Sequence, residues 1–288
     1  TNLSSTELQA LTSAQLNALS STNLQALTSS QVATLSTGQV AALSSAQLNL
    51  LGTNQVTNLS STELQALTSA QLNALSSTNL QALTSSQVAT LSTGQVAALS
   101  SAQLNLLGTN QIVKLSSTEL QSLTSAQLNA LSSTNLQALT TSQLTGLTTA
   151  QIQSLGSGTL ANLSTTEVNA LTSSQLASIG TASLVGLSTA DAVALSTNQM
   201  NALSNSQLNA LGTANLNALT STQVQALTTA QIPGLNSNSL AALSTANMTQ
   251  LTSTQLDALS SAQLNNLSSG NLQALTSSQI QVLSTGQI

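Results

Sequence analysis

Large aliphatic residues recur along the whole chain in blocks of eight. Counting from Leu3, the blocks read LSSTELQA, LTSAQLNA, LSSTNLQA and LTSSQVAT, and the register holds without insertion or deletion to Ile288. We number the positions of each octad 1 to 8. Position 1 is Leu except at Ile179, and position 6 is Leu, Val, Ile or Met except at Ala192. The 288 residues correspond to about 36 repeats, which predicts a single continuous octapeptide-repeat solenoid over 1–288.

A short helix that restarts in every octad fits this pattern better than a strand or one long helix. Positions 1 and 6 have opposite parity, so a straight strand would place them on opposite faces. Eight residues at about 100° each leave a drift of roughly 80° per octad, so the aliphatic stripe would wind around a continuous helix. A β-solenoid with a turn in every octad stays as the alternative, although only 13 Gly residues are present to form its corners.

The local start of each helix is specified by a capping box. Position 2 is Ser, Thr or Gly, apart from Asn236, and position 5 is mostly Gln, Glu or Asn. A Ser or Thr N-cap accepts from the backbone N–H three residues on, and a Gln or Glu there reaches back. Positions 1 and 6 then form the hydrophobic staple. We therefore predict an all-α solenoid of very short capped helices, one per octad.

Such helices need their neighbours. Isolated helices shorter than about 12–15 residues are marginal in water, so each octad has to bury its aliphatic pair against adjacent octads of a coil. The octad pattern does not determine how many octads complete one turn of the coil. Pro233, followed by Gly234, marks a less regular stretch over 140–250, where a helix is expected to end early.

A longer period of 56 residues lies over the octads. Residues 1–55 recur unchanged as 57–111, and a partial third copy occupies the chain from 113, with Ser122 in place of Ala66. Nearly identical tandem copies are typical of arrays that grow by duplication, and we expect this chain to be a segment of a longer one.

Composition removes support for most chemical functions. The chain has no His, Cys, Phe, Tyr or Trp, and its charged residues make up 2% of the total. The usual ligands of zinc, haem and iron–sulfur centres are therefore missing. Lys114, the only basic residue, cannot neutralise a run of phosphates, so we expect no nucleic-acid partner. No run of 18 apolar residues is present, so we expect no membrane span.

We expect no catalytic, cofactor-binding or metal-binding residue, no cofactor and no enzyme activity. The candidate residues for acid–base chemistry are the position-5 carboxylates, which lie in the first helical turn, where the helix dipole favours an anion. A glycosidase pair needs two carboxyls within about 5–10 Å, whereas the first three of these residues are 56 residues apart. Helix capping explains all of the position-5 carboxylates, which are Glu7, Glu63, Glu119, Glu167 and Asp191.

Surface modification and ligand binding stay open. Five N-x-S/T triplets occur as by-products of the repeat, at Asn2, Asn58, Asn162, Asn247 and Asn266. Rows of Ser and Thr are compatible with O-glycosylation, or with binding to ice or a glycan, although ice-binding faces usually favour Thr alone.

The octad L-[ST]-[ST]-x-Q-[LIV]-x-A resembles, over the whole chain, the LTTAQIAAL-type tandem repeats of giant surface or secreted proteins of Gram-negative bacteria, often labelled adhesin-like. The resemblance implies an extracellular or cell-surface structural role and supplies no catalytic residues. We therefore expect a bacterial structural repeat protein that forms or extends an extracellular filament, sheath or matrix fibre by stacking and self-association. The alternatives are a passive stalk of a large adhesin, and an ice- or glycan-binding repeat surface.

Overall fold

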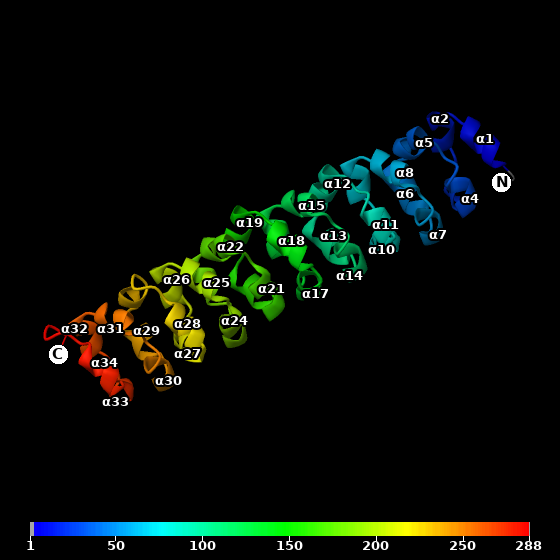
Figure 1. Cartoon of the computed structure of the whole chain (residues 1–288). Helices are drawn as coiled ribbons and strands as arrows, with labels where there is room; N and C mark the ends of the chain where they lie inside the picture. Colours follow the sequence, from blue (N-terminus) through cyan, green and yellow to red (C-terminus); the bar gives the residue numbers. More distant parts are fainter. Residues whose placement is uncertain (1–2, 288) are drawn as a thin grey trace. The chain divides into compact units, whose positions relative to one another are not determined.

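The computed structural model describes residues 3–287 and consists of short helices throughout (Figure 1). No strand occurs within residues 3–287, so the all-α prediction is confirmed and the β-solenoid alternative is not adopted. The chain divides into two compact units, Thr1–Gly146 and Leu147–Ile288, and each is described by itself.

In the first unit each helix has four to six residues and occupies one octad. Its helices are α1 (Ser5–Ala10), α2 (Ser13–Asn17), α3 (Ser21–Gln25), α4 (Ser29–Val32), α5 (Thr37–Ala42), α6 (Ser45–Leu50), α7 (Thr53–Val56), α8 (Ser61–Ala66), α9 (Ser69–Asn73), α10 (Ser77–Ala82), α11 (Ser85–Val88), α12 (Thr93–Ala98), α13 (Ser101–Leu106), α14 (Thr109–Ile112), α15 (Ser117–Gln121), α16 (Ser125–Asn129), α17 (Ser133–Gln137) and α18 (Thr141–Gly146).

The second unit repeats this design, with one octad formed by a 3₁₀ helix, η1. Its helices are α19 (Thr149–Gln153), α20 (Ser157–Ala161), α21 (Thr165–Ala170), α22 (Ser173–Ser178), α23 (Thr181–Leu184), α24 (Thr189–Ala194), α25 (Thr197–Ala202), α26 (Asn205–Ala210), α27 (Thr213–Ala218), α28 (Ser221–Ala226), η1 (Ile232–Gly234), α29 (Ser237–Ala241), α30 (Thr245–Met248), α31 (Ser253–Asp257), α32 (Ser261–Asn265), α33 (Ser269–Ala274) and α34 (Ser277–Gln281).

The helices begin where the capping box predicts. At the start of α5 the backbone N–H of Gln39 donates to Ser36 Oγ at 3.2 Å, and the Ser36 N–H donates to Gln39 Oε1 at 2.9 Å. Where position 2 is Gly52, no hydroxyl is present, but the Gly52 N–H still donates to Gln55 Oε1 at 2.7 Å. The side chain at position 5 therefore preserves half of the box when the N-cap has no side chain.

The aliphatic side chains of positions 1 and 6 form the core. In α8 the position-6 side chain of Leu64 is 0% exposed, and Leu67, which opens the next octad, is 3% exposed. Full burial of one such side chain contributes about 1.5–3 kcal/mol relative to exposure. Burial against other octads therefore supplies the stability that a four- to six-residue helix lacks on its own.

One turn of the coil takes between three and four octads. Helix α5 packs on α2 and α8, and α12 packs on α9 and α15, so helices three octads apart are neighbours. The hydrogen bonds that join successive turns connect residues 25 to 31 apart, with 25, 28 and 31 among the recurring separations. Figure 1 shows successive turns side by side within each unit. A 28-residue turn is half of the 56-residue period, so residues in equivalent places of the tandem copies lie two turns apart.

Pro233 shortens the helix of its octad but leaves the hydrogen bonds of Gln231 to the preceding turn in place. The octad from Leu227 to Gly234 forms the 3₁₀ helix η1 instead of an α-helix, as expected for a proline that has no N–H to donate. Gln231 Oε1 still accepts from the Thr228 N–H, and its Nε2 still donates to the carbonyl oxygens of Met200 and Leu203 in the preceding turn. The irregularity is therefore confined to the end of a single octad.

A glycine at position 8 allows two turns to approach closely. A Cβ atom on Gly186 would overlap the backbone carbonyl oxygen of Ser157, which lies in α20, the neighbour of α23. We therefore expect Gly186→Ala to lower the free energy of unfolding by about 1–3 kcal/mol, the usual cost of overpacking. Chemical denaturation, followed by circular dichroism and by hydrogen exchange in residues 157–187, measures this change.

Gly158→Ala is the matched control. Gly158 lies inside α20 of the same unit, and nothing lies within 4 Å of a Cβ placed there. Alanine in an open helix interior is expected to stabilise by about 0.5–1 kcal/mol, because it loses less backbone entropy on folding. Equal effects of the two substitutions would contradict the close approach at Gly186.

Candidate functional site

The most extensive polar feature is a row of side-chain amides that joins successive turns. We call it the amide ladder, and it is formed by the Gln and Asn residues at position 5. Gln95 is typical: it is 3% exposed, and its Nε2 donates to the carbonyl oxygens of Leu64 and Leu67, both at 2.8 Å. Its Oε1 accepts from the Ser92 N–H at 2.9 Å. Each Gln of this kind therefore caps its own helix and bonds to the turn before it.

Glutamine suits this position because it has a donor, an acceptor and sufficient length. The shorter Asn79 donates to the carbonyl oxygens of Leu48 and Leu51 at 3.3 and 3.1 Å, but its side chain does not bond back to the N-cap of α10. The capping box by itself accepts Glu as well as Gln. Capping needs only an acceptor, so the preference for Gln over Glu at position 5 indicates that a hydrogen-bond donor is needed there as well. The capping box alone did not predict this second role.

Position 7 forms a second, exposed set of inter-turn bonds, which the sequence analysis did not predict. Gln65 Nε2 donates to the Thr90 carbonyl oxygen at 2.7 Å, 25 residues later. Asn49 makes two bonds, since its Nδ2 donates to the Ala74 carbonyl oxygen at 2.6 Å and its Oδ1 accepts from the Ser76 N–H at 2.7 Å. Successive turns are therefore joined by side chains from both directions.

The carboxylates of position 5 cap their helices, as predicted. Glu63 accepts from the Ser60 N–H at 2.6 Å, and Glu119 accepts from the Ser116 N–H at the same distance. Both are buried, whereas Glu7 in the same sequence context is exposed. The pKa of Glu7 is lowered, first by the backbone N–H of Ser4 and then by its hydroxyl. Burial of the later copies was not predicted from the sequence.

These acidic side chains are not assembled into a site that is typical of metal binding. Within residues 3–287 no group of three His, Cys, Asp or Glu side chains is placed to hold a metal ion. Glu63 and Glu119 are two coil turns apart. Asp191 accepts from the Ser188 N–H at 2.9 Å and from Thr165 Oγ1 at 2.9 Å. Each of these carboxylates thus accepts a bond from its own N-cap, and Asp191 also accepts one from Thr165 in the preceding turn, whereas Glu167 Oε1 is buried without a partner in the described part of the chain.

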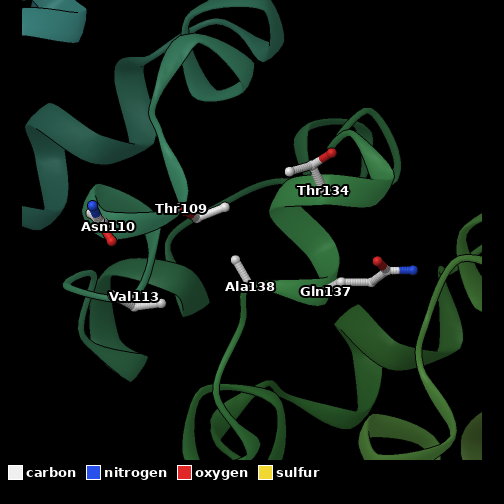
Figure 2. A pocket seen from close by; sticks show the side chains of 6 residues that line it. All are labelled: Thr109, Asn110, Val113, Thr134, Gln137 and Ala138. Carbon is white, nitrogen blue, oxygen red and sulfur yellow. The ribbon is translucent and has the colours of Figure 1, made fainter.

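Two open grooves flank the short helix α14. The first, of about 390 Å³, lies between α14 and α17. Figure 2 shows Thr109, Asn110 and Val113 on one side of it and Thr134, Gln137 and Ala138 on the other. The second, of about 490 Å³, shares Thr109 and Asn110 and extends past Gly108 towards Thr84. Both are lined by hydroxyls, amides and aliphatic groups, so they offer hydrogen bonds to a neutral polar ligand.

The possible N-glycosylation sites differ in accessibility. Asn247 is 3% exposed and its Nδ2 donates to the Leu219 carbonyl oxygen at 2.9 Å, so a glycan there is incompatible with this fold. Asn58, Asn162 and Asn266 are exposed. Asn2 lies outside the described residues.

Among the helices of the described part of the chain, none combines the length and apolar character that crossing a bilayer requires.

The fold and the amide ladder define a class of protein, an α-helical solenoid built from octapeptide repeats. The ALTTAQ repeat family matches the chain seven times, at residues 1–37, 29–61, 58–93, 87–117, 120–157, 168–205 and 205–237. The chain belongs to the ALTTAQ repeat family, which confirms the resemblance found in the sequence. Comparison with curated proteins finds no match. Family and architecture together indicate a structural repeat protein.

Proposed function

We propose that this chain is a passive structural element that forms or extends an extracellular filament, sheath or matrix fibre of a bacterium by stacking and self-association. The observation that carries the proposal is the repetition of one inter-turn interface, with the same aliphatic pair and the same amide bonds in octad after octad. An array of this kind extends by addition of identical turns. That the whole of 1–288 forms one continuous solenoid stays a prediction, based on the unbroken octad register.

The last coil turn of the described residues shows which side chains an added turn would cover. Leu272 in α33 and Ile280 in α34 occupy position 6, yet they are 42% and 48% exposed, whereas Leu64 in the same position is 0% exposed. A further coil turn, from the same chain or from a second copy, would cover them. The low charge of the chain also favours association, because near-neutral polar surfaces repel one another weakly.

Sedimentation velocity and electron microscopy of the 288-residue polypeptide test this proposal. We expect open-ended oligomers that grow with protein concentration and depend little on salt, and we expect Leu272→Ser with Ile280→Ser to reduce them. Val185→Ser is the control, since Val185 is 66% exposed but lies at position 7. Monomers at every concentration would contradict self-association of this segment.

Two alternative functions, an adhesin stalk and a glycan- or ice-binding surface, predict different experimental results. A stalk of a large adhesin needs the same stacked turns but no self-association, and a globular binding domain in the full-length gene would favour it. The grooves beside α14 favour a neutral glycan as ligand, because their lining offers hydroxyls and amides without charge. Blank glycan arrays and absence of thermal hysteresis would remove the glycan- and ice-binding functions.

A further inference from the structure

Two buried carboxylates interrupt the amide ladder of the first unit. In the octads on either side of Glu63, Gln55 donates to the Leu24 and Leu27 carbonyl oxygens, and Gln71 donates to those of Ala41 and Leu43. The repeat places residue 63 opposite the corresponding carbonyls, 31 and 28 residues earlier, which belong to Val32 and Leu35.

An ionised Glu63 cannot make the inter-turn bonds that Gln makes. A carboxylate accepts hydrogen bonds but has no hydrogen to donate, so the ionised Glu63, which is 3% exposed, cannot bond to the carbonyl oxygens of the preceding turn as Gln does. A protonated carboxyl has the shape of the Gln amide. Its carbonyl oxygen can accept from the Ser60 N–H, and its O–H can donate to a backbone carbonyl of the preceding turn.

We propose that Glu63 and Glu119 are acid-responsive contacts between coil turns, incomplete when the carboxyl is ionised and completed when it binds a proton. Glu119 occupies the equivalent place 56 residues later, opposite the carbonyls of Val88 and Leu91, although Ser122 replaces Ala66 in its octad. The first unit thus carries two links, two turns apart, whose strength depends on pH. This inference does not depend on self-association.

The neighbouring helices leave these carboxyls without a charged partner. Helix α5, which packs on α8, has the sequence TGQVAA, and α12 and α18, which pack on α15, have no charged residue. Glu7, Glu63, Lys114 and Glu119 are the only charged side chains of residues 3–146. Lys114 is exposed between α14 and α15, so Lys114→Gln serves as the control for its influence on Glu119.

Glu7 is an internal control, because it caps its helix in the same way but lies against no earlier turn of residues 3–287. It lies in the same octad, LSSTELQA, but it is exposed, and the Ser4 N–H lowers its pKa. A group whose pKa is lowered by folding contributes stability above its ordinary pKa, and this contribution is lost as the pH falls through the folded value. Acidification is therefore expected to weaken the cap of α1, where no inter-turn bond forms in its place.

Hydrogen exchange on the full chain tests the proposal, with protection corrected for the intrinsic pH dependence of exchange. At pH 7, Glu63→Gln with Glu119→Gln is expected to raise protection in residues 32–35, 63–67, 88–91 and 119–123 by roughly three- to tenfold, as one hydrogen bond provides. At about pH 3, below the usual titration range of Glu, the wild type is expected to reach the protection of the variant. Glu7→Gln is expected to leave these segments unchanged.

The reciprocal variant is Gln71→Glu, which replaces bonds of 2.8 and 2.7 Å to Ala41 and Leu43. It is expected to create a new acid-responsive contact, with protection of residues 41–43 reduced at pH 7 and restored in acid. Equal protection of the wild type and the double Gln variant at pH 7, or no recovery of the Gln71→Glu variant in acid, would overturn the proposal.

Discussion

Leu176→Ala is expected to lower the free energy of unfolding by about 2–5 kcal/mol, as truncation of a buried Leu usually does. Leu176 lies in α22, at position 6 of its octad, and is 0% exposed. Helix α22 packs on α19 and α25, so the cavity would weaken the contacts of three consecutive turns. Since each turn touches mainly its neighbours, we expect local opening around α22 before the rest of the unit unfolds. Urea denaturation and hydrogen exchange in residues 147–203 measure the two effects.

The control for Leu176→Ala is Val185→Ala. Val185 follows α23 in the same unit and is 66% exposed. Substitutions at such surface positions usually change stability by less than about 0.5 kcal/mol. A loss of comparable size at Val185 would mean that the aliphatic core at position 6 is not the main source of stability.

Gln95→Ala is expected to have the second largest effect, a loss of about 2–4 kcal/mol. The substitution removes the donor to the Leu67 carbonyl oxygen and the acceptor for the Ser92 N–H. Each buried polar group that loses its partner costs about 1–3 kcal/mol. Alanine is the best helix former, so helix propensity does not account for the loss. Chemical denaturation with hydrogen exchange in residues 64–67 measures it.

Gln65→Ala is the matched control for the amide ladder. Gln65 has the same side chain, but it is exposed and makes one bond, to the Thr90 carbonyl oxygen. Because water replaces an exposed partner, we expect a loss below about 1 kcal/mol. If Gln65→Ala and Gln95→Ala destabilised equally, the inter-turn bonds of buried Gln residues would not be the reason for the choice of residue at position 5.

The three Glu-containing octads, LSSTELQA twice and LSSTELQS from Leu115, show the limit of local information. Glu7, Glu63 and Glu119 have the same neighbours in sequence and cap their helices in the same way. Yet Glu7 is exposed and the others are buried, because within residues 3–287 an earlier turn packs only against the two later copies. The capping role was therefore predictable, while the burial depended on residues about 28 positions away.

The sequence alone determined the α-helical class, the octad register, the N-caps and the aliphatic pair of the core, because the interactions that encode them join residues three to five apart in the chain. The tertiary structure decided that one coil turn takes between three and four octads, and it assigned inter-turn bonds to the amides of positions 5 and 7. The physical reason is the likeness of the octads. When every block offers the same carbonyls and the same Leu side chains, the sequence does not distinguish a partner three octads away from one four octads away. Only the packing of successive turns in space makes that choice.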